Sequence, residues 1–152
     1  MSFAEATIES GCLDVSTADM VTETANEQVF CRATEIKTEK QGGSYKEVKQ
    51  PGEGAIKEVH HTPADSASKL ERDDGPAIKM DIADHRQTAS YGNSRDARAY
   101  QAKQKDLIDN GKFREALQMD IDDIHEKFGD KYDEAISQMF EYVDKLEAEG
   151  KI

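Results

Sequence analysis

Three of the four histidines in this 152-residue chain lie close together in the sequence. His60 and His61 are adjacent, and Asp84 and His85 follow them at a distance of 24 residues. A neutral imidazole can take a proton from water, and it can also bind a divalent metal ion. Hydrolysis of a phosphodiester needs both functions, because a base must activate water and a cation must stabilise the charge that develops on the phosphate and on the leaving oxygen. The spacing therefore predicts one site within residues 59–92 that could bind a metal ion and activate water.

Two short strands and one helix are expected to position these side chains. Residues 55–59 alternate between apolar and polar types, as in a half-buried strand, and they lead directly into the adjacent histidines. Neighbouring side chains of a strand point to opposite faces, so both histidines can serve one site only if the strand breaks or twists, which residues 62–63 (TP) permit. A second strand is expected at 77–80, and Asp81 is suited to begin a helix that carries His85. This order of elements would bring the helix back over the end of the first strand.

The last third of the chain has a strong helical pattern. Asn93 or Ser94 can cap a first helix, which residues 109–111 (DNG) end. Apolar residues then recur at helical spacing through 113–128 and again through 132–146. We expect three amphipathic helices that pack against one another or against the strands, and that bury Leu107, Leu117, Ile121, Ile136, Met139 and Phe140.

The region before residue 42 has a different character. Residues 1–41 contain many Thr, Glu, Ala and Ser residues with weak periodicity, which is typical of an arm or of a junction with a larger parent protein. Stretches rich in glycine or proline at 41–44 and 50–54 predict loops. We therefore place the organised domain at 42–152.

The two cysteines, Cys12 and Cys31, argue against a zinc site built on thiolates, because they form no CxxC pair and lie far from the histidines. The sequence leaves open whether they form a disulfide. No apolar run approaches the roughly 20 residues that a membrane helix needs, and the first residues do not resemble an export signal. We expect no membrane association and no export signal within the chain.

The charge of the chain is strongly acidic and unevenly distributed. The net charge is -12, which argues against a general nucleic-acid binder, because Lys and Arg supply most of the non-specific affinity for phosphates. Residues 86–105, however, contain five basic residues and one acidic residue, whereas 112–152 contain six basic and twelve acidic residues.

His125 is expected to be a packing or surface histidine. The acidic run beside it is typical of a solvated helix face and comprises Asp120, Asp122, Asp123 and Glu126.

Several short motifs resemble one family of nucleases. The segments 59–63 (VHHTP), 75–78 (GPAI) and 84–92 (DHRQTASYG) resemble the HNH/endonuclease VII-type, or His-Me finger, nuclease domains at the C-termini of bacterial polymorphic toxins. Residues 99–136 resemble the helical tail of the same group, and the resemblance covers about residues 42–147. It implies an α+β fold, in which a small ββα-metal finger is followed by a C-terminal bundle of about three helices.

The resemblance also implies roles for individual residues. His61 would be the general base that activates water, and His60 and His85 would bind the metal ion. Asp84 is a further candidate ligand, and Arg86 is a candidate for clamping the scissile phosphate. Two more arginines are candidates for contacts along the nucleic-acid backbone, with a solvated helix face as the alternative, and these are Arg95 and Arg98.

The ligand set and the metal are less narrowly defined. The position four residues after the helix histidine is Ala89, which cannot bind a metal, so Asp84, Thr88, Ser90 and solvent all stay open as the third ligand. Mg²⁺ is expected if oxygen ligands dominate, and Zn²⁺ or Ni²⁺ if two imidazoles bind together. Mn²⁺ is a further candidate.

The function implied is that of an antibacterial toxin domain that cleaves nucleic acid, with DNA preferred over RNA. Such a domain would be secreted or injected within a larger delivery protein, would act in the cytoplasm of a target cell, and would have a cognate immunity protein. One alternative is a ribonuclease on the same scaffold. Another is a non-catalytic acidic interaction module, such as an antitoxin or adaptor, whose acidic helices bind a basic partner.

Overall fold

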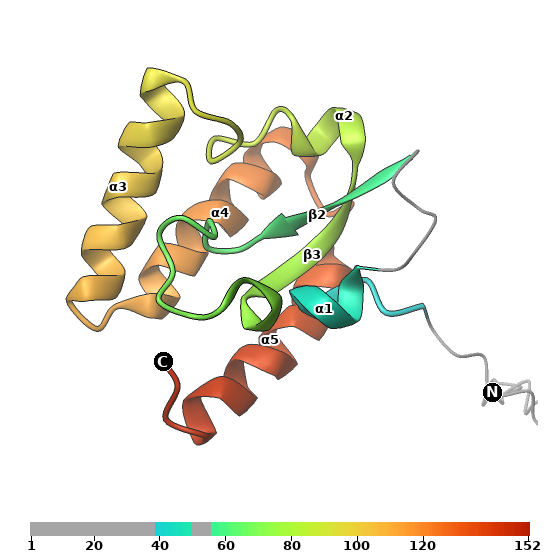
Figure 1. The fold of residues 1–152 in the computed structure, drawn as a ribbon. Helices are drawn as coiled ribbons and strands as arrows, with labels where there is room; N and C mark the ends of the chain where they lie inside the picture. The colour runs from blue at the N-terminus through green and yellow to red at the C-terminus, as the bar shows by residue number, and fades with distance from the viewer. Residues whose placement is uncertain (1–38, 50–55) are drawn as a thin grey trace, which may run out of the picture. The chain divides into compact units, whose positions relative to one another are not determined.

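A three-stranded antiparallel sheet with helices packed against it forms the part of the chain that the computed structural model describes, residues 39–49 and 56–152 (Figure 1). The strands are β1 (Gly42–Ser44), β2 (Lys57–His61) and β3 (Pro76–Asp81), in the order β1-β3-β2. Most of the expected N-terminal arm, both cysteines and the expected loop at 50–54 lie outside the described residues. The α+β class is confirmed.

Both strands and all three long helices expected from the sequence are present. The strand with alternating residues becomes β2, and the second expected strand becomes β3. Ser94 caps the first long helix, since its side chain accepts a hydrogen bond from the Ala97 N–H at 3.1 Å. The helices, in chain order, are α1 (Tyr45–Val48), the 3₁₀ turn η1 (Arg72–Asp74), α2 (Ile82–His85), α3 (Arg95–Asp109), α4 (Phe113–Phe128) and α5 (Asp133–Ala148).

The long helices do not form a separate bundle. Helices α3 and α4 pack against each other, whereas α5 packs against β1 and β3 (Figure 1). Burial of apolar side chains between these layers supplies the main stabilising free energy. Of the six expected core residues, Leu117, Ile121, Ile136 and Met139 are buried, and Leu107 and Phe140 are partly buried against the same core. Within the described residues, no helix is long and apolar enough to cross a membrane.

The prediction of a loop at 41–44 is wrong over its last three residues. Gly42 to Ser44 form strand β1 and pair with β3, where Gly42 lies opposite Ile78. The reason is a close approach that only glycine allows: a Cβ atom added to Gly42 would lie 1.9 Å from the backbone oxygen of Ala135 in α5. Here the glycine permits a strand to pack directly on a helix backbone, rather than marking a loop.

The expectation of a solvated acidic face on α4 is wrong at Asp120, and Asp123 also has only 12% of its side chain exposed and accepts a hydrogen bond from the Ala89 N–H. Asp120 is buried, with 2% of its surface exposed, and its Oδ2 atom has no hydrogen-bond partner. Burial raises the pKa of this carboxyl to about 7, an effect that contacts with Gln104 and Tyr100 partly offset. Asp120 therefore belongs to the packed interior of the α3–α4 pair.

Candidate active site

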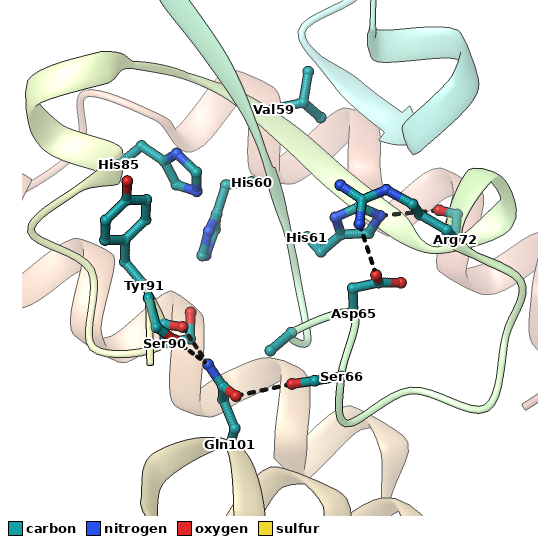
Figure 2. Close-up of a pocket in the computed structure, with 12 residues that line it drawn as sticks. Val59, His60, His61, Asp65, Ser66, Arg72, His85, Ser90, Tyr91 and Gln101 are labelled. Atoms are coloured by element: carbon teal, nitrogen blue, oxygen red, sulfur yellow. Dashed lines mark hydrogen bonds and ion pairs between the residues drawn. The ribbon is translucent and has the colours of Figure 1, made fainter. Parts of the chain in front are cut away.

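A cavity of about 380 Å³ lies at the end of β2 and brings together the three clustered histidines. His60 and His61 come from β2, and His85 comes from the last residue of α2. The cavity is also lined by Arg72, from the connection between β2 and β3, and by Tyr91, from the segment after α2 (Figure 2). The sequence expectation that His85 returns over the strand end is confirmed.

The two adjacent histidines lie on opposite faces of β2, as the alternation of a strand requires. His60 is paired in register with Ile78 and His61 with Ala77. Both still line one cavity, because β2 is an edge strand that ends at His61, and the cavity extends around that end. Figure 2 shows His60 beside His85 on one side of the strand, and His61 beside Arg72 on the other.

His61 is oriented by contacts on three sides. Its Nε2–H donates a hydrogen bond to the backbone carbonyl of Arg72 at 2.9 Å. Its ring stacks on Tyr45 with centroids 4.2 Å apart and planes at 15°. Gly75 makes room for the ring, since a Cβ there would lie 3.0 Å from His61 Cδ2. Burial lowers the pKa of His61, so the ring is neutral near pH 7 and its Nδ1 atom keeps a lone pair that can accept a proton.

His60 and His85 form an imidazole pair. Their ring centroids lie 5.1 Å apart in an edge-to-face arrangement. His60 is 3% exposed, and its buried Nε2 atom has no hydrogen-bond partner. Burial, with smaller contributions from the neighbouring His85 and His61, lowers the pKa of His60 to about 3. A neutral, buried imidazole nitrogen without a partner is unusual, because burial of an unsatisfied polar atom costs free energy.

Glu58 fixes the orientation of the second ring in this pair. The Nδ1–H of His85 donates to Glu58 Oε2 at 2.6 Å, and this bond holds the pKa of Glu58 below its usual range. A carboxylate in this position stabilises the tautomer whose Nε2 atom carries a lone pair, the arrangement found behind metal-bound histidines. Sequence analysis missed Glu58, although its place two residues before His60 puts it on the same face of the strand.

His60 and His85 could bind a divalent metal ion together with solvent molecules. Within residues 39–49 and 56–152, no group of three or more His, Cys, Asp or Glu side chains is arranged to hold a metal ion. The unpartnered Nε2 of His60 and the lone pair at Nε2 of His85 are the donors that a divalent cation would use. Water or substrate oxygens would have to complete the coordination shell.

Asp84, the expected acidic ligand, is engaged elsewhere and does not line the cavity. Its Oδ2 atom accepts hydrogen bonds from Lys131 Nζ and from the Tyr132 hydroxyl, both at 2.6 Å. The bond from Lys131, followed by that from Tyr132, lowers the pKa of Asp84. The Tyr132 hydroxyl also accepts from the backbone N–H of Asp81 at 3.1 Å. The turn before α5 thus holds the start of α2, and a ligand role for Asp84 stays a prediction.

The arginines expected to bind substrate are not among the residues that line the cavity. Arg86 is exposed and lies 3.3 Å from the other oxygen of Glu58. Arg95 and Arg98 are exposed on the first turns of α3. Their contacts with nucleic acid stay predictions. His125 is exposed and bonds to Asp133 at 2.7 Å, so its assignment as a surface histidine is confirmed.

Comparisons of the chain with protein-family models, with curated proteins and with solved structures found no match.

Proposed function

We propose that this chain is a metal-dependent endonuclease in which β2, β3 and α2 form a ββα-metal finger, as in the toxin nucleases that its motifs resemble. The observation that carries the proposal is the meeting of His60, His61 and His85 at one cavity, with one ring held as a base and two others presenting nitrogen lone pairs. Three histidines with unrelated structural roles would not be expected to converge in this way.

The chemistry assigned to His61 follows from its hydrogen bond. With Nε2–H committed to the Arg72 carbonyl, Nδ1 accepts the proton of a water molecule as the water oxygen attacks phosphorus. The new P–O bond forms as the bond to the leaving oxygen breaks, and the leaving oxygen takes a proton from solvent. The stack on Tyr45 holds the ring in place during this transfer.

His60 and His85 would hold the divalent cation, and Glu58 would keep His85 in the tautomer that binds it. The cation, when bound, stabilises negative charge on the phosphate and on the leaving oxygen. Because both proposed protein ligands are imidazoles, Zn²⁺ or Ni²⁺ becomes the first candidate, with Mn²⁺ and Mg²⁺ as alternatives. The two-imidazole arrangement favours the transition metals more than the sequence alone does.

The biological setting proposed is that of a toxin domain. The substrate would be DNA in preference to RNA, in the cytoplasm of a target cell reached through a larger delivery protein, and a cognate immunity protein would neutralise the activity. An acidic interaction module is the second candidate, because the net charge of -12 opposes tight binding to nucleic acid.

Digestion of plasmid DNA and of total RNA tests the proposal. The chain is incubated with each substrate in Mg²⁺, Mn²⁺, Zn²⁺, Ni²⁺ or EDTA, beside the His61→Ala variant and a matched surface control, His125→Ala. We expect cleavage that needs a metal, that is lost in EDTA and in His61→Ala, and that persists in His125→Ala. Full activity in EDTA, or no cleavage of either substrate with any metal, would rule the proposal out.

A further inference from the structure

We infer that Arg72 binds the scissile phosphate in this cavity and that Asp65 occupies its guanidinium until substrate arrives. This inference rests on the proposed nuclease function and assigns a substrate-binding residue to the same site. Sequence analysis placed the phosphate clamp at Arg86, whose guanidinium lies near Glu58.

Arg72 lines the cavity next to His61. Among the described residues that line the cavity, Arg72 is the only Lys or Arg. Its backbone carbonyl accepts the hydrogen bond from His61, so the residue that would hold the phosphate also orients the ring that would activate water. Its guanidinium lies over the Tyr45 ring, 5.2 Å from the centroid, and the same ring stacks on His61. Arg72 and His61 therefore share one aromatic support.

Arg72 is paired with an acidic residue, Asp65, in the same cavity. Its Nη1 donates to Asp65 Oδ2 at 3.0 Å, and Asp65 also lines the cavity (Figure 2). The Arg72 side chain is 63% exposed, so a phosphate in solvent can reach it. A guanidinium binds two phosphate oxygens through parallel N–H groups, which gives both affinity and orientation.

The acidic partner should compete with substrate. A phosphate bound to the Arg72 guanidinium must either displace the Asp65 carboxylate or lie beside it. In the second case the two negatively charged groups repel each other. An exposed ion pair of this kind adds little to folding stability. Removing the carboxylate should thus strengthen substrate binding, while removing the guanidinium should weaken it. A purely structural ion pair predicts instead that both substitutions act in the same direction.

Binding measurements without turnover test these opposite signs. Anisotropy of a short fluorescein-labelled DNA duplex, and separately of a labelled RNA, is followed with the His61→Ala protein in EDTA, so that no cleavage occurs. Onto that background we add Arg72→Gln, Arg72→Lys and Asp65→Asn, with Lys103→Gln, an exposed position on α3, as the control for a general loss of positive charge. Thermal unfolding of each variant checks that the loop is intact.

We expect Arg72→Gln to weaken binding about tenfold, the loss of one charge-assisted contact, and to reduce the salt dependence by about one ion. Arg72→Lys should fall between Arg72→Gln and the background, and Asp65→Asn should bind several-fold more tightly. Equal effects of Arg72→Gln and Lys103→Gln, or weaker binding in both Arg72→Gln and Asp65→Asn, would overturn the inference alone. Failure of the background protein to bind either probe would instead overturn the proposed function, and the inference with it.

Discussion

The Nδ1 atom of His85 lies 2.6 Å from the Oε2 atom of Glu58, so a strand residue determines which nitrogen of a helix-borne imidazole is left to bind a ligand. The second oxygen of the same carboxylate lies 3.3 Å from Arg86. Glu58 is thus the contact between β2 and the segment that carries His85.

Replacement of Glu58 tests this relationship. Glu58→Gln keeps the shape of the side chain but removes its charge, which weakens the hydrogen bond that orients the His85 ring, so we expect metal affinity to fall by about 10- to 100-fold. Calorimetric titration of metal into the variant measures the change. Glu126→Gln, an exposed substitution on α4, is the control. Unchanged affinity in Glu58→Gln would show that His85 does not bind the metal.

Replacement of His61 should affect cleavage, whereas replacement of His60 should affect metal binding. His61→Ala should keep metal affinity near that of the parent and lower cleavage by about 10²-fold or more, since general-base catalysis contributes roughly 10²–10⁴. His60→Ala and His85→Ala should weaken metal binding itself, and excess metal should restore part of their activity. Calorimetry beside a plasmid-nicking assay separates binding from chemistry. Loss of metal in His61→Ala with normal binding in His60→Ala would reverse the assignments.

Asp120 should make the protein less stable as pH rises. Its pKa is about 7 in the folded chain and 3.8 as its ordinary value, so the folded state keeps a proton that the unfolded state has lost between these pH values. The contribution of Asp120 to the free energy of unfolding is fully present below about pH 4 and is lost by about pH 7. The free energy of unfolding should fall by roughly 4 kcal/mol at most over this range. Chemical denaturation from pH 4 to 8 measures it. Asp120→Asn should flatten this dependence, and an identical pH profile in the variant would contradict the assignment.

Gly42→Ala should destabilise the domain through a collision with α5. The added methyl would lie 1.9 Å from the Ala135 oxygen, so β1 or α5 must move, at a cost of about 3 kcal/mol. Gly111→Ala is the matched control, because Gly111 has φ 74 and open space around its Cβ position, and should lose only about 1 kcal/mol. Denaturant unfolding compares the two. Similar losses in both variants would show that the close approach is not limiting.

Periodicity predicted the elements whose side chains repeat with a regular face. Helices α3, α4 and α5 and strands β2 and β3 all followed from it, as did the return of His85 to the histidine pair. Strand β1 could not be predicted, because its glycines are informative only once α5 lies against them. The burial of Asp120 was hidden in the same way, since an acidic run does not show which of its members faces another helix.

Three residues of the site, in a regular strand and in an irregular connection, differ in how far the sequence could predict them. Glu58 could have been found from the sequence, because alternation along a strand places it on the His60 face. Arg72 and Asp65 belong to an irregular connection, where spacing along the chain does not determine which side chains meet. Their approach to His61 depends on the path of that connection over Tyr45.

The hydrogen bonds from Lys131 and Tyr132 to Asp84 have a consequence for the order in which a newly synthesised chain becomes competent. The ribosome releases both strands and all three clustered histidines well before it releases the turn that anchors α2. A nascent chain that ends before residue 131 contains every proposed catalytic side chain but lacks the partners that hold the start of α2 in place. Assembly of the site therefore waits until the turn that carries Lys131 and Tyr132 has been synthesised.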